Sequence, residues 1–289
     1  MANGILVIDK PADWTSHDVV AKLRGILRIK RIGHAGTLDP RATGVLPVFV
    51  GRATRAAEFA AEREKEYIAG LRLGTVTDTQ DVTGSVLETR PVSADRHDLE
   101  RVLDRFRGDI LQVPPMYSAV KRNGKRLYEL ARRGEEVERA LRPITIYALE
   151  LLEQVTETDY ILRVLCSKGT YVRTLCHDIG QALGCGGTLY ALRRTRAAGF
   201  DLSQAVTLEQ VAEAEEPTAL LLPVGSCFDR YPSLPLADPE SERRVRNGNP
   251  LALDGESGIY RVYGPNGDFL ALSRLENGRL TTIKSFFEV

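Results

Sequence analysis

The pattern of apolar and polar residues along the chain predicts a mixture of strands and helices. Residues 4–8 and 45–50 are continuous apolar runs of the length of buried strands. Residues 16–27 carry apolar positions at helical spacing, and Thr15 or Ser16 is placed to cap that helix. The same criteria predict strands at 66–73, 144–153, 160–167 and 188–195 and helices at 52–61, 95–106, 125–133 and 170–183.

The order of these elements indicates the fold class. Strands and helices do not alternate regularly, so an α+β fold fits better than a doubly wound parallel sheet. After the proline-containing stretch 232–239, short apolar segments are separated by Asn-Gly turns, which is typical of a small all-β module. For a chain of 289 residues we therefore predict one large domain over 1–231 and a small β domain over 232–289.

Membrane, metal and redox features are not expected from this sequence. No apolar run approaches the ~20 residues that span a bilayer, and the apolar run near the N-terminus is too short for a signal peptide. The cysteines at 166, 176, 185 and 227 form no close pair of the kind that binds zinc or acts as a redox dithiol. We therefore expect a cytoplasmic protein with no membrane association and no metal.

Charge is balanced over the whole chain but not along it. Lysine plus arginine and aspartate plus glutamate each total 39. Residues 22–55 nevertheless hold eight basic side chains and one acid, while 117–133 and 163–196 each hold six basic side chains and one acid. Solvated helix faces are the alternative explanation, but they usually mix both signs. The asymmetry, with tyrosines interleaved, indicates a surface for the phosphate backbone of a nucleic acid.

Residues 33–47 form the most unusual segment. It contains three glycines, two prolines, His34 and Asp39 between a basic helix and a buried strand. The glycine spacing does not match a phosphate-binding loop, so no nucleotide cofactor is predicted. Asp39 is the one acid among the eight bases of residues 22–55, and an ionised aspartate can act as a nucleophile or base. The alternative is an aspartate that closes a turn.

A second candidate segment covers residues 167–174. Gly169-Thr170 opens the helix predicted there, so Tyr171 and Arg173 fall in or near its first turn. Free N–H groups at a helix start favour an anion. Arg173 can pair with a carboxylate, and the ring of Tyr171 can stack on a base. The alternative is a capped helix with an exposed arginine.

These motifs resemble those of a known family. The stretch GHAGTLDPRATGVL at 33–46 closely resembles the catalytic motif of the bacterial tRNA pseudouridine synthase B family, and the similarity continues in order to about residue 200. The further matching motifs are KEY at 65–67, TDTQD at 77–81, PMYSAVK at 115–121, SKGTYVRTL at 167–175 and LRR at 192–194.

The resemblance implies a fold and a reaction. The fold is the pseudouridine synthase catalytic fold, with a central, mixed but mostly antiparallel sheet flanked by helices, followed by a small PUA-like β domain. The reaction converts the T-loop uridine of tRNA (position 55) to pseudouridine by breaking the N1–C1′ bond and joining C5 to C1′. That isomerisation involves no redox change and no external group, so no cofactor is implied. The implied partner is the T arm stem-loop of tRNA, and the family suggests a monomer.

The resemblance also assigns roles to individual residues. Asp39 corresponds to the catalytic aspartate, Arg173 to the partner of that carboxylate, and Tyr171 to a group near C5 that can take its proton. The residues assigned to the uridine pocket are His34, Tyr67, Asp81, Tyr171 and Leu192. From the basic segments, the residues predicted to contact the RNA backbone are Lys121, Arg122, Arg193 and Arg194.

Two functions of other classes are the alternatives. A non-catalytic RNA-binding or RNA-folding factor would use the basic surface but would have no need of Asp39 with its tyrosine and arginine partners. A metal-free nucleoside hydrolase would use Asp39 to activate water but would need little basic surface. The sequence therefore favours the synthase.

Overall fold

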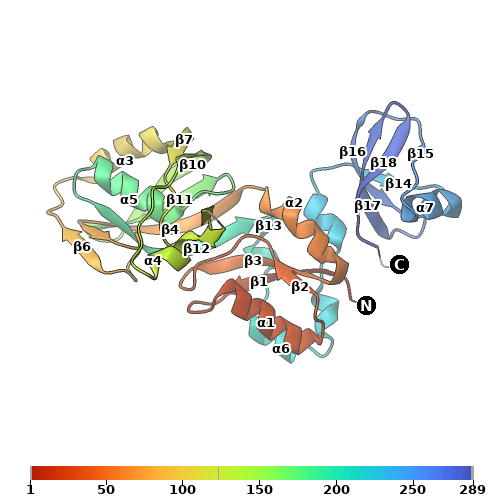
Figure 1. Ribbon diagram of the computed structural model, residues 1–289, viewed down its shortest axis with the longest axis horizontal. Coiled ribbons are helices and arrows are strands. Elements are labelled where there is room, and N and C mark those ends of the chain that lie inside the picture. The colour runs from red at the N-terminus through yellow and green to blue at the C-terminus, as the bar shows by residue number, and fades with distance from the viewer. Residues whose placement is uncertain (1, 123, 288–289) are drawn as a thin grey trace. The chain divides into compact units, whose positions relative to one another are not determined.

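The computed structural model describes residues 2–122 and 124–287 and contains two compact units (Figure 1). The first unit comprises the described residues up to Pro40, residues 44–62 and those from Ala197 onward. The second unit comprises residues 41–43 and the described residues of 63–196. The first unit therefore combines segments that lie far apart in the sequence.

The N-terminal strands of the first unit pair in antiparallel fashion. β1 (Gly4–Lys10) runs against β3 (Thr43–Val50), with Gly4 opposite Val50 and Lys10 opposite Gly44. β2 (Ile32–His34) also pairs with β3. β1 and β3 are buried over almost their whole length, which confirms the prediction of strands from continuous apolar runs.

Helix α1 (Ser16–Leu27) packs against these strands, and its bounds are those predicted from the sequence. Thr15 is the N-cap: its side chain accepts a hydrogen bond from the Asp18 N–H, and the Asp18 carboxylate accepts one from the Thr15 N–H. The helix buries its apolar face, including Val19 and Leu23, in a core shared with β1, β3 and helix α6 (Leu208–Glu213). The capped start of α1 is thereby fixed against the strands.

The first unit also contains several short elements, which lie within residues 51–61 and 200–228. The predicted helix at 52–61 consists of two pieces, a 3-10 turn η1 (Gly51–Ala56) and the helix α2 (Ala57–Ala61). The remaining elements are β13 (Phe200–Asp201), η3 (Leu202–Gln204), η4 (Pro217–Leu220) and η5 (Val224–Phe228).

A five-stranded sheet forms the last part of the first unit (Figure 1). Its strand order is β14-β16-β17-β18-β15. The strands are β14 (Ser233–Pro235), β15 (Leu251–Ala252), β16 (Gly258–Tyr263), β17 (Phe269–Glu276) and β18 (Arg279–Ser285). The sheet confirms the β module, but the all-β description is incomplete because helix α7 (Pro239–Arg246) precedes β15. Asp238 as N-cap and Pro239 at the first helical position were the sequence signals for it.

The second unit contains a larger sheet with strand order β12-β4-β11-β10-β7. β4, β11, β10 and β7 are joined by antiparallel pairs, and α3 and α5 flank them (Figure 1). The strands are β4 (Lys65–Leu73), β7 (Gly108–Gln112), β10 (Arg142–Gln154), β11 (Asp159–Cys166) and β12 (Gly187–Ala197). The helices are α3 (Arg96–Leu103), extended by the turn η2 (Asp104–Phe106), and α5 (Val172–Ala182). β7 was not predicted.

Two hairpins extend the second unit. β5 (Thr75–Thr77) pairs with β6 (Val86–Thr89), and β8 (Lys121–Arg122) pairs with β9 (Lys125–Arg126). Helix α4 (Leu127–Ala131) follows β9 directly, so the helix predicted over 125–133 is shorter than expected. Its first two residues form a strand because they pair with β8.

The compact units do not follow the division of the chain at 231, since residues of the N-terminal and C-terminal segments share one core that includes Ile5, Phe49, Phe228 and Phe286. The boundary between residues 231 and 232 stays a prediction. Within the described residues, no helix is both long and apolar enough to cross a bilayer.

Candidate active site

Asp39 lies in the loop that connects β2 to β3 in the first unit, and its side chain is half-buried. The loop begins at a fixed point, because His34 pairs with Val48 and the N–H of Ala35 donates to the Pro47 carbonyl at 3.1 Å. Gly36 then turns the chain with a φ of 78°, a value that glycine adopts without strain. The carboxylate is thus carried by a short loop with an anchored start.

Lys10 restrains the same loop at Pro40 by a hydrogen bond. It is the last residue of β1, and its side chain is fully buried. Its Nζ donates to the carbonyl of Pro40 at 2.9 Å and to the carbonyls of Trp14 at 2.6 Å and Pro11 at 2.8 Å. Three carbonyl oxygens offset the cost of burying an ammonium group. The carbonyl of Pro40, the residue directly after Asp39, is therefore tied to the end of β1, a link that the sequence pattern did not indicate.

His34 faces a second histidine. The ring of His17, the second residue of α1, meets the ring of His34 edge to face with a centroid distance of 5.3 Å and an interplanar angle of 86°. His34 is half-buried, whereas His17 is exposed. One side of the His34 ring therefore packs against a residue of α1.

Arg173 is the centre of the candidate residues in the second unit. Only 6% of it is exposed, and it sits in the first turn of α5. Its Nη1 donates to the Thr79 carbonyl at 3.1 Å and its Nη2 to the Tyr117 carbonyl at 2.8 Å, while its Nε lies 3.9 Å from Asp81 Oδ2. The guanidinium therefore joins three motifs that are widely separated in the sequence.

Asp81 organises the loop that faces Arg173. Its Oδ1 accepts hydrogen bonds from the Thr79 hydroxyl at 2.9 Å and from the Thr83 N–H at 2.9 Å. The loop is also attached to β12, because the Val82 N–H donates to the Leu189 carbonyl at 3.0 Å. Asp81 thus presents one oxygen to its own loop and the other to Arg173.

Tyr171 precedes α5 as its N-cap residue, with an extended backbone, so this helix starts two residues later than predicted. Gln112, at the end of β7 and 2% exposed, bonds the Tyr171 backbone twice: Oε1 accepts from the N–H at 2.8 Å, and Nε2 donates to the carbonyl at 3.1 Å. The half-buried side chain of Tyr171 is thereby carried by a fixed backbone. A lone glutamine gave no sequence signal for this role.

Tyr67 and Leu192 lie on neighbouring strands, β4 and β12. Tyr67 is 7% exposed and Leu192 is half-buried. The two strands are also joined by side chains, since the Thr195 hydroxyl donates to Glu66 Oε1 at 2.9 Å. Both candidate pocket residues therefore belong to one rigid sheet rather than to loops.

Arg194 differs from the other predicted backbone-binding residues. Lys121 and Arg122 are exposed and Arg193 is half-exposed, but Arg194 is fully buried on β12. Burial lowers the pKa of its guanidinium, and a hydrogen bond with the Tyr67 side chain acts in the opposite direction. Its burial corrects the prediction for Arg194, because a guanidinium closed off from solvent does not reach a phosphate; here it supports Tyr67.

Asp178, on α5, is expected to reduce stability at neutral pH. Burial raises the pKa of its carboxyl to about 6 from 3.8. The folded state therefore favours the protonated form of this carboxyl. Its contribution to the free energy of unfolding is fully present below pH 4 and is lost as the pH rises through about 6. Asp178→Asn should therefore be about 1 kcal/mol more stable than the parent at pH 7, after allowance for solvent screening of a partly exposed group. Urea unfolding at pH 4 and pH 7 measures this, and equal pH dependence in both proteins would contradict it.

The four cysteines lie outside the set of candidate site residues. All are free and buried, and burial raises the pKa of Cys166 to about 11 and that of Cys176 to about 12. Such thiols are poor nucleophiles at neutral pH. In the part of the chain that the structure describes, no group of three or more His, Cys, Asp or Glu side chains is arranged to hold a metal ion.

The match to a family model decides the identity of these motifs. Residues 24–172, more than half of the chain, match the model described as TruB family pseudouridylate synthase, N-terminal domain. The chain belongs to the TruB family of pseudouridylate synthases. A second TruB-related model, the C-terminal domain of tRNA pseudouridylate synthase B, matches residues 173–228.

Full-length relatives agree with this TruB assignment. A tRNA pseudouridine synthase B of Clostridium kluyveri is 42% identical over 98% of this chain and 99% of the relative. The protein of the same name from Stutzerimonas stutzeri is 46% identical over 96% of this chain and 93% of its own length. That of Heliobacterium modesticaldum is 52% identical over 76% of this chain.

Solved structures share the TruB fold. One chain of an H/ACA ribonucleoprotein bound to a substrate RNA containing 2'-deoxyuridine aligns with 99% of this chain, and 85% of that chain is covered, with a TM-score of 0.75 and 26% identity. A chain of a Cbf5–Nop10–Gar1 complex gives a TM-score of 0.75 and 28% identity over the same share. The predicted class is confirmed: a pseudouridine synthase α+β fold with a small PUA-like β domain at its C-terminal end.

Proposed function

We propose that this chain converts the T-loop uridine of tRNA, at position 55, to pseudouridine, with Asp39 as the catalytic carboxylate. The chain is a tRNA pseudouridine synthase by its family and its relatives over nearly the full length. The observation that carries the finer proposal is that the family match includes the loop between β2 and β3, where Asp39 stands half-buried between two anchored ends.

The reaction is an isomerisation within one nucleotide. The N1–C1′ bond breaks, the uracil turns, a C5–C1′ bond forms, and the proton on C5 leaves while N1 gains one. Asp39 serves this sequence by attacking C6 of the base, by attacking C1′ of the sugar, or by removing a ribose proton. Each route uses the same carboxylate in nearly the same place, and none needs a metal or a cofactor.

The other candidate residues have separate tasks. A base inside a folded loop is reached only after it leaves the stack, at a cost of a few kcal/mol. His34 fills the space from which the uridine leaves, and its ring is backed by His17. Tyr67 packs on the uracil and Leu192 closes the pocket wall. Tyr171 takes the C5 proton. The Asp81–Arg173 pair connects the loop that contains Asp81 to the start of α5.

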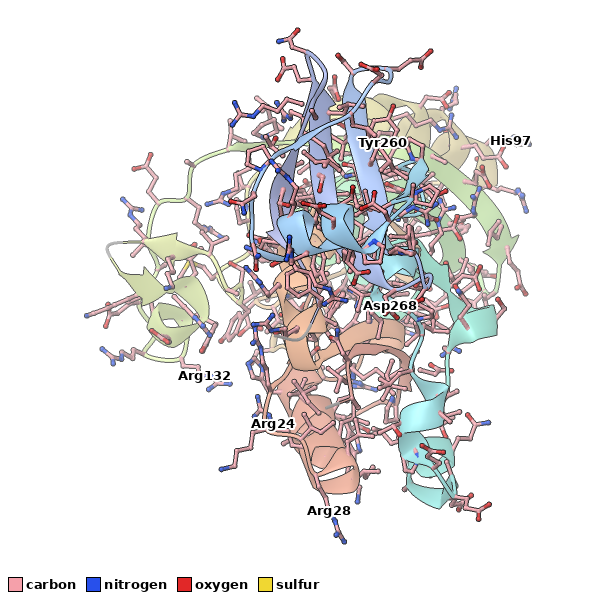
Figure 2. All side chains as sticks on the ribbon, turned by 90° about the vertical axis from the view of Figure 1, so that its right-hand side faces the viewer. Arg24, Arg28, His97, Arg132, Tyr260 and Asp268 are labelled. Atoms are coloured by element: carbon pink, nitrogen blue, oxygen red, sulfur yellow. The ribbon has the colours of Figure 1, made fainter. Side chains whose placement is uncertain are left out.

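The RNA backbone binds at least in part to the β8–β9 hairpin. Lys121 stands opposite Arg126, and Arg122 stands opposite Lys125, with all four side chains exposed. Like charges directly opposite each other on a two-stranded ladder repel. A polyanion removes that repulsion, so the hairpin is matched to phosphates. In the first unit, Arg28 directly follows α1 and its exposed side chain points away from the helix, which makes it a separate candidate for a phosphate contact (Figure 2). Arg24 is also exposed, but its Nη2 donates to the Ile32 carbonyl at 3.0 Å.

Replacing Lys121 and Arg122 together by alanine is expected to weaken tRNA binding and to flatten its salt dependence. The slope of log affinity against log salt concentration should become shallower by ~0.7–0.9 for each phosphate contact that is lost. The rate of the bound complex should be spared, because neither side chain has a chemical role. Filter binding at four salt concentrations gives the slope, and single-turnover rates give the reactivity.

The matched control for that experiment removes two arginines from α3. Arg96 and Arg101 are exposed and already paired with Glu100 and Asp98. Arg96→Ala/Arg101→Ala changes the net charge by the same amount and should leave the slope unchanged. An equal change of slope in both double variants would mean that net charge, rather than the hairpin, governs binding.

One assay separates the proposed function from its alternatives. The protein is incubated with an unmodified tRNA transcript, and pseudouridine is mapped chemically along the product. Pseudouridine at the T-loop position is the expected result. Free uracil would identify a hydrolase, an unchanged transcript would identify a binding factor, and pseudouridine elsewhere only would refute the assigned position.

The domain bounds, the oligomeric state, the location and the tRNA contact also remain part of the proposal. We expect the catalytic domain to comprise residues 1–231 and the PUA-like domain residues 232–289. We expect a monomer that acts in the cytoplasm and contacts the T arm of tRNA without a metal. Size-exclusion chromatography with light scattering measures the molar mass of the free protein and so tests the expected monomer.

A further inference from the structure

Ser16 opens helix α1 but points away from the capping interactions. The helix is capped by Thr15 and Asp18, which satisfy each other's backbone N–H groups. Ser16 is 1% exposed, and both hydrogen bonds of its hydroxyl go to one distant residue, Leu38. Its side chain is therefore not needed to start the helix.

The Ser16 hydroxyl binds the Leu38 backbone on both sides. Oγ accepts from the Leu38 N–H at 2.9 Å and donates to the Leu38 carbonyl at 3.2 Å. Leu38 is 3% exposed, so water does not readily replace either bond. A single hydroxyl thus satisfies both polar groups of the residue directly before Asp39.

The contacts of Ser16 and Lys10 lie on either side of Asp39. Ser16 fixes Leu38, and the Lys10 ammonium fixes the Pro40 carbonyl at 2.9 Å. The backbone is then restrained immediately before and after the carboxylate, which itself stays half-buried. A catalytic group needs this restraint, since a displacement of about 1 Å can cost ~100-fold in rate.

We propose that Ser16 is a positioning residue that fixes the direction of the Asp39 carboxylate through the Leu38 backbone. The proposal rests on the proposed function of Asp39. It assigns Ser16 to the rate of the chemical step rather than to the binding of tRNA. It also separates Ser16 from its neighbour Thr15, which serves only the helix.

The test compares Ser16→Ala with Thr15→Ala. Ser16→Ala leaves two buried polar groups of Leu38 without their partner, and Thr15→Ala removes the cap of the same helix without touching Leu38. We expect Ser16→Ala to lower the single-turnover rate constant about 10–100-fold while the Kd for tRNA stays within about 3-fold. Thr15→Ala should lower the melting temperature but keep the rate constant within about 2-fold.

Each outcome decides the proposal. A wild-type rate constant in folded Ser16→Ala would overturn it, and so would parallel losses of rate and stability in both variants, which would reduce Ser16 to a helix-stabilising role. Ser16→Cys keeps the shape of the side chain with a slightly larger atom and bonds Leu38 weakly, so its rate should lie between those of the wild type and Ser16→Ala. If Ser16→Ala does not fold, a Ser16→Cys rate equal to that of the wild type would be the refuting result. A wild-type protein that forms no pseudouridine would instead refute the proposed function.

Discussion

Asp39→Asn is expected to abolish turnover while tRNA binding stays within a few-fold of the wild type. The substitution keeps the shape of the side chain and removes the negative charge that all three routes through Asp39 require. Loss of a group that bonds to or deprotonates the substrate typically removes nearly all catalysis beyond binding effects, so we expect at least about a 1000-fold decrease. Pseudouridine formation in a single turnover, with excess enzyme, measures it.

Asp13→Asn is the matched control. Asp13 is an exposed aspartate just before α1, with a φ of 63°, a conformation that asparagine also adopts readily. The same change of charge and shape there should leave the rate unchanged. Turnover by Asp39→Asn at more than a few per cent of the wild-type rate would overturn the assignment of Asp39.

Tyr171→Phe is expected to bind tRNA normally and to stall after the C5–C1′ bond forms. Phenylalanine keeps the ring but loses the hydroxyl that takes the C5 proton. The backbone of residue 171 should stay in place, because Gln112 bonds its N–H and carbonyl rather than the side chain. The measurement is tritium release from 5-tritiated uridine in tRNA, compared with glycosidic-bond rearrangement in the same single turnover.

Tyr171→Leu provides the comparison that separates the ring from the hydroxyl. Leucine removes both, so the variant should also bind the flipped base more weakly, by roughly 1–3 kcal/mol for the lost stacking. Tritium release near the wild-type rate by Tyr171→Phe would show that another group takes the proton. Tyr171 would then be a stacking residue only.

Local sequence signals predicted the elements that depend on local physics. Apolar runs and periodicity predicted β1, β3, β4, β10, β11 and β12. A strand that buries one or both faces needs apolar residues at alternating or continuous positions, and this pattern can be read directly from the sequence. The bounds of α1 were predictable because its capping residues lie within one turn. Where pairing with a second segment decides the structure, prediction was wrong: 125–126 is a strand because it meets 121–122.

Among the site residues, the sequence alone determined which residue types carry the candidate chemistry: a lone carboxylate in a basic segment, and a tyrosine and arginine at a helix start. Only the tertiary structure decided their surroundings. It buried Arg194 beside Tyr67, and it brought Lys10, Ser16 and Gln112 to backbone groups up to 59 residues away. A hydrogen bond depends on distance and direction in space, and no spacing rule along the chain encodes a partner that folding brings from another element.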